Sequence, residues 1–154
     1  MPTRRRLAFI IHGARAASPA MRHLVAWVRE RGHCVEPHVT WERGDATRLA
    51  RAAAESEPDA VVAVGGDGTV NEVINGLIDL ETPLGIIPLG TANDFARQAG
   101  IPLDADHAMD IILHRNPVPI DTARVNGRRY LNASVGGVGA ENLRVHLARL
   151  PGEP

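Results

Sequence analysis

The residues with the clearest chemical potential form a glycine-rich turn, Gly65-Gly66-Asp67-Gly68-Thr69. The apolar, largely β-branched run Ala60–Val64 precedes it and is typical of a fully buried parallel strand. After the turn, apolar residues recur at helical spacing, so the turn joins a strand to a helix. Backbone N–H groups left uncovered by glycine at the positive end of a helix attract phosphate. The turn therefore predicts a phosphate-binding loop.

Side chains in this segment make the predicted chemistry more specific. Thr69 and Glu72 stand three residues apart, which is the spacing of a capping box at the start of a helix. Asp67 puts a carboxylate beside the phosphate, and this repels the ligand unless a cation separates them or the carboxylate binds a hydroxyl group instead. Magnesium that bridges to the phosphates is the usual solution. The loop thus indicates a nucleoside triphosphate with Mg²⁺.

The absence of lysine narrows the class of phosphate-binding protein, since all 17 Lys and Arg residues are arginine. A Walker A loop and a protein kinase both require a lysine at the phosphates, so neither class fits. A dinucleotide-binding fingerprint also fits poorly, because Asn71 stands where its third glycine belongs. The next expected strand, 84–87, leads into Pro88-Leu89-Gly90-Thr91 and not to an acidic ribose-binding residue.

The elements that must position this loop alternate between strand and helix along the chain. Alternation of this kind predicts an α/β fold in three layers, a parallel sheet with helices on both faces. Ligands bind such sheets beyond the carboxyl ends of the strands, which adds the loops His12–Arg15, Thr40–Asp45 and Pro88–Asp94 to the site. We expect strands over 7–11, 34–39, 60–64 and 84–87, and helices from Ser18-Pro19 to Gly32, over 45–57, after the glycine turn, over about 92–99 and over 104–114.

The pattern changes after Pro119. Two strand-like runs, 120–125 and 128–133, flank Asn126-Gly127, which is a strong signal for a two-residue hairpin turn. The glycine-rich stretch 134–139 and an amphipathic stretch over 140–150 follow. Because a hairpin is marginally stable by itself, we expect a nucleotide-binding domain over 1–118 and the start of a truncated, β-rich second domain over 119–154. The alternative is an antiparallel extension of the main sheet.

Composition limits the partners. The 154 residues carry a net charge of −1 and only two Trp, two Phe and one Tyr, so neither a basic surface nor a stacking platform for nucleic acid is expected. The lone Cys34, expected to be buried and inert, fits a cytoplasmic protein, and the histidines show no metal-ligand spacing with it. No apolar run approaches the roughly 20 residues of a membrane span, so membrane contact is expected to be peripheral at most.

Two motifs taken together resemble the catalytic domain of the diacylglycerol kinase type: Gly65–Val73 and Pro88–Ala96. NAD kinases and phosphofructokinases share Gly-Gly-Asp-Gly, whereas Gly-Thr-Ala-Asn-Asp-Phe in the second motif is a lipid-kinase-type signature. Val39–Ala46 and Ile120–Asn126 narrow the resemblance to bacterial lipid kinases of the YegS type. The resemblance implies an NAD kinase/diacylglycerol kinase-like fold, the cofactors ATP and Mg²⁺, and a lipid acceptor such as a diacylglycerol or phosphatidylglycerol head group.

The resemblance also implies site residues. Asn93 and Asp94 are candidates for the acceptor or metal side, and a cap for a helix over 95–99 is their alternative role. His12 stands where the first loop of the family usually carries asparagine, so the resemblance does not assign the adenine-side contact at this position. The nucleotide-binding positions of the family fall on Thr40, Gly66, Asp67, Gly68, Thr69, Val70, Asn71, Glu72 and Thr91.

Three functions remain open on this basis. The first is the ATP-binding half of a lipid kinase. Family members are considerably longer, and their second domain supplies the general base and much of the lipid site, so this polypeptide by itself is expected to bind nucleotide and turn over poorly. The others are a non-catalytic ATP-binding module that acts with a partner, and an NAD-kinase-like enzyme. An apolar surface over 120–150 is expected as well, and a homodimer could cover it.

Overall fold

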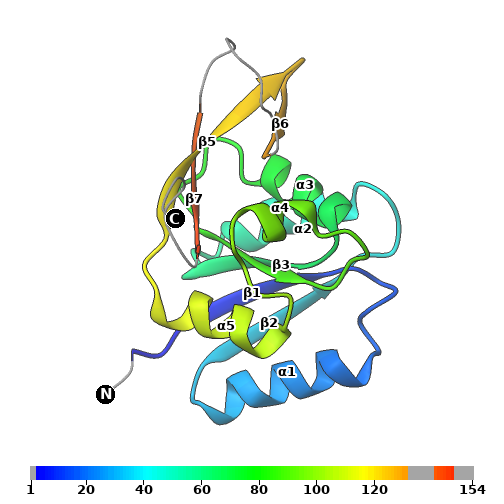
Figure 1. Ribbon diagram of the computed structural model, residues 1–154, viewed down its shortest axis with the longest axis vertical. Coiled ribbons are helices and arrows are strands. Elements are labelled where there is room, and N and C mark those ends of the chain that lie inside the picture. Colours follow the sequence, from blue (N-terminus) through cyan, green and yellow to red (C-terminus); the bar gives the residue numbers. More distant parts are fainter. Residues whose placement is uncertain (1–2, 132–140, 148–154) are drawn as a thin grey trace.

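The computed structural model describes residues 3–131 and 141–147 and contains a seven-stranded sheet. Four strands run parallel: β1 (Arg6–Ile11), β2 (Cys34–Val39), β3 (Ala60–Gly65) and β4 (Leu84–Pro88). Three more extend the sheet: β5 (Val118–Val125), β6 (Arg128–Tyr130) and β7 (Glu141–Val145). Their order is β2-β1-β3-β4-β7-β5-β6 (Figure 1). The predicted α/β fold with a mostly parallel sheet is confirmed.

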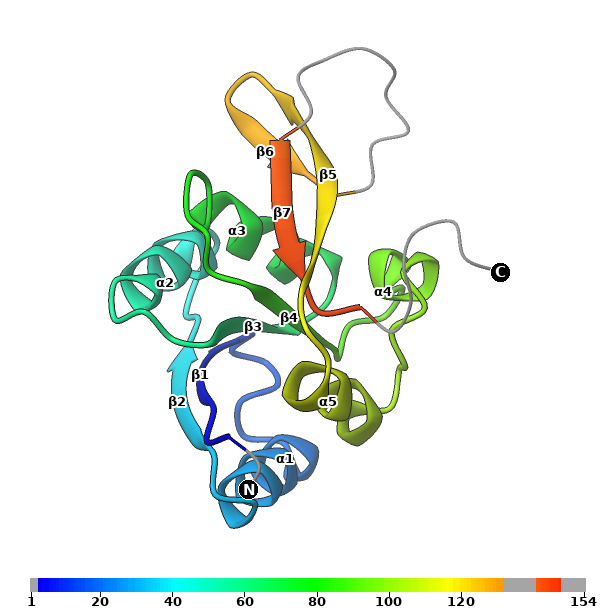
Figure 2. The ribbon, with the colours of Figure 1, turned by 90° about the vertical axis from the view of Figure 1, so that its left-hand side faces the viewer.

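Helices cover both faces of this sheet. The five helices of the described residues are α1 (Pro19–Glu30), α2 (Asp45–Ala54), α3 (Asp67–Gly76), α4 (Asp94–Gln98) and α5 (Ala105–His114). Figure 2 shows α2 and α3 on one face and α1 and α5 on the other. The arrangement has the three layers that the alternation of strands and helices predicts. All of β3, at the centre of the parallel strands, is buried.

The ends of the helices follow from local signals in two cases. Ser18 caps α1, because its Oγ accepts a hydrogen bond from the N–H of Met21 at 3.2 Å, and Pro19 opens the helix as expected. Asp104 caps α5 in the same way, through the N–H of His107 at 3.0 Å.

Two details differ from the sequence-based expectations. Helix α2 ends at Ala54 and is shorter than the predicted 45–57. Cys34 is half-buried rather than buried, and its Sγ lies 2.9 Å from an Nη of Arg4.

Small residues allow α2 and α3 to pack closely. Ala46 and Ala50 of α2 are buried against the core. Gly76 of α3 lies so near α2 that a Cβ at this position would overlap the carbonyl oxygen of Thr47. The helix that begins at the glycine turn therefore packs tightly against α2.

The predicted hairpin is present as β5 and β6. Asn126 and Gly127 both have positive φ, 50° and 77°, as a type I′ turn requires. Strand β7 runs antiparallel to β5 and parallel to β4, so the hairpin continues the main sheet through β7, which is the alternative given above for this segment. The boundary between 1–118 and 119–154 stays a prediction. The glycine-rich stretch 134–139 and the end of the predicted strand 128–133 lie outside the described residues.

The hairpin is also attached to α3 by a side chain. Oδ1 of Asn75 accepts a hydrogen bond from the N–H of Arg129 at 2.8 Å, and Nδ2 of Asn75 donates to the carbonyl of Arg129 at 3.0 Å. Asn75 thus pairs with the backbone of β6 as a neighbouring strand would. Helix α3, which begins at the glycine turn, therefore holds the hairpin through a residue near its C-terminal end.

Candidate nucleotide-binding site

A cleft opens where the parallel strands reach their carboxyl ends. Its larger part, about 570 Å³, is lined by segments around His12, Thr40 and Glu72. Its smaller part, about 260 Å³, is lined by the glycine turn and by Leu89 and Gly90. The two parts share four lining residues and are therefore adjacent: His12, Ala14, Gly68 and Thr69. The glycine turn and the three loops predicted from the sequence thus meet at one cleft.

The glycine turn passes directly from β3 into α3. Gly66 is the N-cap residue with extended backbone, and α3 begins at Asp67. The predicted capping box of Thr69 and Glu72 is wrong, because the helix starts two residues before Thr69. Thr69 is 6% exposed, and its hydroxyl lies where a Cβ on Gly65 would stand. A side chain at Gly65 would therefore displace Thr69.

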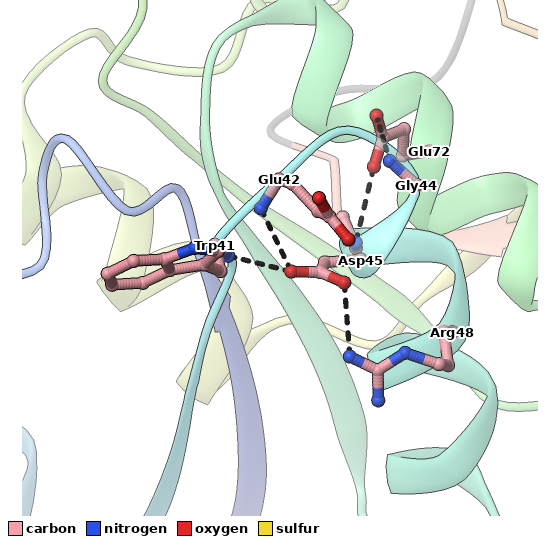
Figure 3. Close-up of polar contacts among 7 residues, drawn as sticks. Trp41, Glu42, Gly44, Asp45, Arg48 and Glu72 are labelled. Atoms are coloured by element: carbon pink, nitrogen blue, oxygen red, sulfur yellow. Dashed lines mark hydrogen bonds and ion pairs between the residues drawn. The ribbon is translucent and has the colours of Figure 1, made fainter.

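The carboxylate of Glu72 caps a different helix. One oxygen accepts a hydrogen bond from the N–H of Gly44 at 3.1 Å and the other from the N–H of Ala46 at 3.2 Å (Figure 3). The N-cap of α2 is Gly44, which has no side chain with which to cap, so Glu72 supplies the missing acceptors. Thr47 adds a hydrogen bond from its hydroxyl to the Glu72 carbonyl at 2.8 Å. Glu72 thus fixes the loop before α2 onto α3.

The loop between β2 and α2 is ordered around Asp45. Its carboxylate accepts hydrogen bonds from the N–H groups of Trp41 at 2.8 Å and Glu42 at 3.0 Å, and Arg48 lies 3.1 Å away (Figure 3). The backbone hydrogen bonds, first from Glu42 and then from Trp41, hold the pKa of Asp45 below its ordinary value. Thr40 Oγ1 accepts from the N–H of Gly13 at 3.1 Å, which leaves the O–H of Thr40 available as a donor.

Asp67 joins the two sequence motifs. Its carboxylate accepts hydrogen bonds from the N–H groups of Asp94 at 3.0 Å and Phe95 at 3.2 Å, and therefore caps α4 from the glycine turn. Asn93 occupies the N-cap position with φ of 52°, but its side chain does not cap the helix. Its amide instead bonds the N–H and the carbonyl of Gly90, both at 2.9 Å. The predicted cap role of Asn93 is therefore taken over by Asp67.

The backbone of the second motif lies against the glycine turn. A Cβ on Gly90 would overlap the Cα of Gly66, so both positions need the space that glycine leaves. The N–H of Leu89 also donates to the carbonyl of Gly65 at 2.9 Å. The two glycine-containing loops are thus built as one unit.

The structure brings some of the predicted site residues to the cleft and not others. Of the nucleotide-binding candidates, Thr40, Gly66, Gly68, Thr69 and Glu72 line it. The side chain of Val70 is 4% exposed and belongs to the core. The remaining candidates line neither part of the cleft, although they belong to the loops and the helix around it: Asp67, Asn71, Thr91, Asn93 and Asp94.

Among the cleft residues to which the sequence assigned no individual role, three carry chemistry that a nucleotide could use. Arg15 lines the smaller part, and Trp41 and Arg43 line the larger part. All three lie in loops that follow predicted parallel strands, and Trp41 and Arg43 also belong to the motif Val39–Ala46, but neither signal assigned them a role. The two arginines supply positive charge at a cleft that has no lysine.

Neither a metal cage nor a membrane-spanning helix is found in the described part of the chain. No three His, Cys, Asp or Glu side chains among these residues gather closely enough to hold a metal ion. No helix over 3–131 or 141–147 has the length and apolar character needed to cross a membrane.

Comparison with known proteins decides the family. Residues 6–125 match the diacylglycerol kinase catalytic domain. The chain belongs to this family. A "Probable lipid kinase YegS-like" protein of Chromohalobacter salexigens is 43% identical over 136 residues, and its namesake in Klebsiella pneumoniae is 43% identical over 133. The resemblance to lipid kinases of the YegS type is thereby confirmed.

A solved structure supports the fold of this diacylglycerol kinase-family chain. The crystal structure of a diacylglycerol kinase from Bacillus anthracis aligns over 83% of the chain with a TM-score of 0.65 and 31% identity, and the alignment covers 46% of that protein. The two YegS-like relatives match over 86% and 84% of the chain but over only 44% and 45% of their own lengths. The chain therefore spans less than half the length of the curated relatives it matches.

Proposed function

We propose that this chain is the ATP-binding half of a lipid kinase, which transfers the γ-phosphate of ATP to the hydroxyl of a lipid of the diacylglycerol or phosphatidylglycerol type. One observation supports the nucleotide role most directly: the glycine turn opens α3 at the wall of the cleft, with Gly68 exposed. Bare N–H groups at a helix N-terminus bind phosphate. The family of the chain supports ATP as the donor.

The residues around the turn divide the work of binding. Gly66 and Gly68 offer backbone N–H groups to the phosphates, and Arg15 adds a charge-assisted contact from the adjoining loop. Thr40 donates its hydroxyl from the other side of the cleft. The carboxylate of Glu72 is occupied by the end of α2, so its contribution is to hold the cleft wall in place. Asn71 and Thr91 stay predictions as ligand contacts.

In this proposal Mg²⁺ binds together with the nucleotide. Mg²⁺ is commonly held by one or two carboxylates together with substrate phosphates and waters, so a dedicated protein cage is unnecessary. Asp67 is the candidate carboxylate: each of its oxygens accepts one N–H and keeps lone-pair capacity for a further partner. Bound there, the ion would neutralise the charge of the phosphates.

The acceptor side lies beyond the described residues in this proposal. Asn93 and Asp94 follow the second glycine loop and are candidates for the edge nearest the lipid hydroxyl. Catalysis of phosphoryl transfer depends on holding the donor and acceptor together, so we expect the 154-residue chain to bind Mg-ATP and to transfer phosphate slowly by itself. We further propose that the protein is cytoplasmic, that it contacts the membrane peripherally and that it forms a homodimer.

Nucleotide binding is tested first, and phosphate transfer to an acceptor is tested second. Calorimetry with Mg-ATP, Mg-ADP and Mg-GTP at millimolar concentration should give binding heat with the adenine nucleotides, and the absence of heat with all three would overturn the nucleotide role. Transfer of labelled phosphate is then measured with diacylglycerol or phosphatidylglycerol in mixed micelles, and with NAD. Phosphorylated NAD would replace the lipid-kinase proposal with the NAD-kinase-like alternative. Binding without transfer, even when a longer family member's second half is added, would favour a non-catalytic module.

A further inference from the structure

One tryptophan side chain at the cleft is almost fully exposed to solvent. Trp41 is 94% exposed and lines the larger part of the cleft. The second tryptophan, Trp27, is half-buried and has the guanidinium of Arg31 3.7 Å from its ring centre. An indole ring offers a large apolar face, and tryptophan that folding does not bury is typical of surfaces that bind a partner. Trp41 therefore needs an explanation that the fold itself does not supply.

The backbone of Trp41 is held firmly although its ring is free. Its N–H donates to the Asp45 carboxylate at 2.8 Å, and the N–H of the preceding Thr40 donates to the carbonyl of Ile11 at 2.9 Å. Figure 3 shows the indole extending away from the Asp45 carboxylate and from α2. The loop is therefore ordered by polar contacts that do not involve the ring. Such a loop fixes the backbone that carries the ring before any ligand arrives, which lowers part of the entropic cost of binding.

The two parts of the cleft differ in chemistry. The smaller part is walled by the backbone of Gly66, Gly68 and Gly90, which suits phosphate. The larger part is lined by Val39, half exposed, and by Trp41, which suit an apolar or aromatic group, as well as by charged side chains that include Arg43. Because the two parts are adjacent, a ligand with an anionic end and a flat aromatic end would reach both. A nucleoside triphosphate has this composition.

We infer that Trp41 is the base-stacking residue of the nucleotide site, with its indole packed against the adenine ring while the phosphates lie at the glycine turn. This inference rests on the proposed nucleotide function and adds the residue that recognises the base. Stacking requires a single aromatic ring, so the scarcity of aromatics, which argues against nucleic acid, does not argue against one base. It also tolerates different bases, because each has a π-face.

The test separates the base from the phosphates by using Mg-ATP and Mg-tripolyphosphate as probes. Trp27→Phe, at a position of α1 that lines neither part of the cleft, leaves Trp41 as the only indole. Mg-ATP should then quench its fluorescence whereas Mg-tripolyphosphate should not. Trp41→Ala should weaken Mg-ATP binding about tenfold or more, and Trp41→Phe should restore part of this loss. Neither variant should change the affinity for Mg-tripolyphosphate or the melting temperature.

Each other outcome has a distinct meaning. If wild-type protein binds neither probe, the nucleotide function fails, and the inference fails with it. If wild-type protein binds both probes but Trp41→Ala leaves both affinities unchanged, the function stands and the stacking role is wrong. Equal loss for both probes would also overturn it, since the ring would then support the cleft as a whole. Unchanged affinities with weaker sedimentation on phosphatidylglycerol vesicles would assign the ring to a membrane surface instead.

Discussion

Asp67 and Asp94 are joined by a hydrogen bond: the carboxylate of Asp67 accepts from the backbone N–H of Asp94 at 3.0 Å. The two residues belong to the two motifs that define the family resemblance, and they lie 27 positions apart. Asp67 also accepts from the N–H of Phe95, so it anchors the start of α4 to the start of α3. A change at Asp67 is therefore expected to have a structural effect and a ligand effect, which can be measured separately.

Asp67→Ala should lower the free energy of unfolding by about 1 kcal/mol, because α4 loses its cap. It should also weaken Mg-ATP binding far more than binding of nucleotide without magnesium. Calorimetric titrations with and without the ion, together with thermal melting, measure the two effects. Asp94→Ala is the matched control for stability, since Asp94 takes part through its backbone. Equal loss of affinity in both titrations would show that Asp67 does not act through the metal.

Substitutions of two cleft glycines should affect nucleotide affinity and protein stability differently. No atom lies within 4 Å of a Cβ built on Gly68, whereas one built on Gly90 overlaps Gly66. Gly68→Ala should therefore keep or slightly raise the melting temperature, as alanine favours a helix over glycine, yet weaken Mg-ATP binding at least about tenfold, or about 1.4 kcal/mol.

Gly90→Ala should instead destabilise the protein by about 1–3 kcal/mol, since the backbone at Gly66 would have to move. Chemical denaturation and calorimetry on both variants make the comparison. If Gly68→Ala binds Mg-ATP as tightly as wild type does, the phosphates do not approach the first turn of α3.

Glu72 belongs to α3 but should also stabilise the start of α2. Glu72→Ala removes both acceptors from the N–H groups of Gly44 and Ala46, which should cost about 1–2 kcal/mol and speed amide exchange at these two positions. Glu42→Ala removes the same charge from an exposed position on the same cleft and serves as the control. Similar exchange rates in the two variants would contradict the capping role.

His146 should make stability depend on pH. It is 2% exposed, and burial, the largest cause, lowers its pKa to about 4 from the ordinary 6.5. The unfolded chain therefore binds a proton below pH 6.5 while the folded chain does not. Stability from this group is complete above pH 6.5, falls as the pH drops from 6.5 to 4 by about 3 kcal/mol in total, and then levels off.

His146→Asn tests this dependence because asparagine can keep the hydrogen bond to the Arg115 carbonyl, 2.9 Å from Nδ1, without titrating. The slope of unfolding free energy against pH between 6.5 and 4 should become shallower in this variant. Part of the slope should remain, since burial also lowers the pKa of His33. An unchanged slope in His146→Asn would assign the acid sensitivity to other groups.

The elements of this fold could be predicted from sequence because their signals are local. The apolar run before Gly65, the Ser18-Pro19 start of α1 and the Asn126-Gly127 turn each depend on neighbours in the chain, and each is present. The glycine turn could be assigned to the end of a cleft for the same reason. Loops after parallel strands meet at one edge of a sheet whatever their sequences.

The capping contacts could not be predicted in this way. Thr69 and Glu72 have the spacing of a local capping box, but Glu72 bonds α2 and Asp67 bonds α4, each about 27 positions away. Tertiary partners compete for the same carboxylates, and the sequence pattern does not record which helix end lies nearby. The exposure of Trp41 could not be predicted for a related reason, since only the folded chain shows that its ring is left uncovered.

Asn75 has a mechanical consequence for the whole molecule. Its amide pairs with the Arg129 backbone at one end of α3, while the other end of the same rod forms the glycine turn. A tilt of the β5–β6 arm must therefore either break both of these bonds or swing α3 with it. Force applied to this hairpin within a longer polypeptide would thus be transmitted to the glycine turn through α3, a single helix of ten residues.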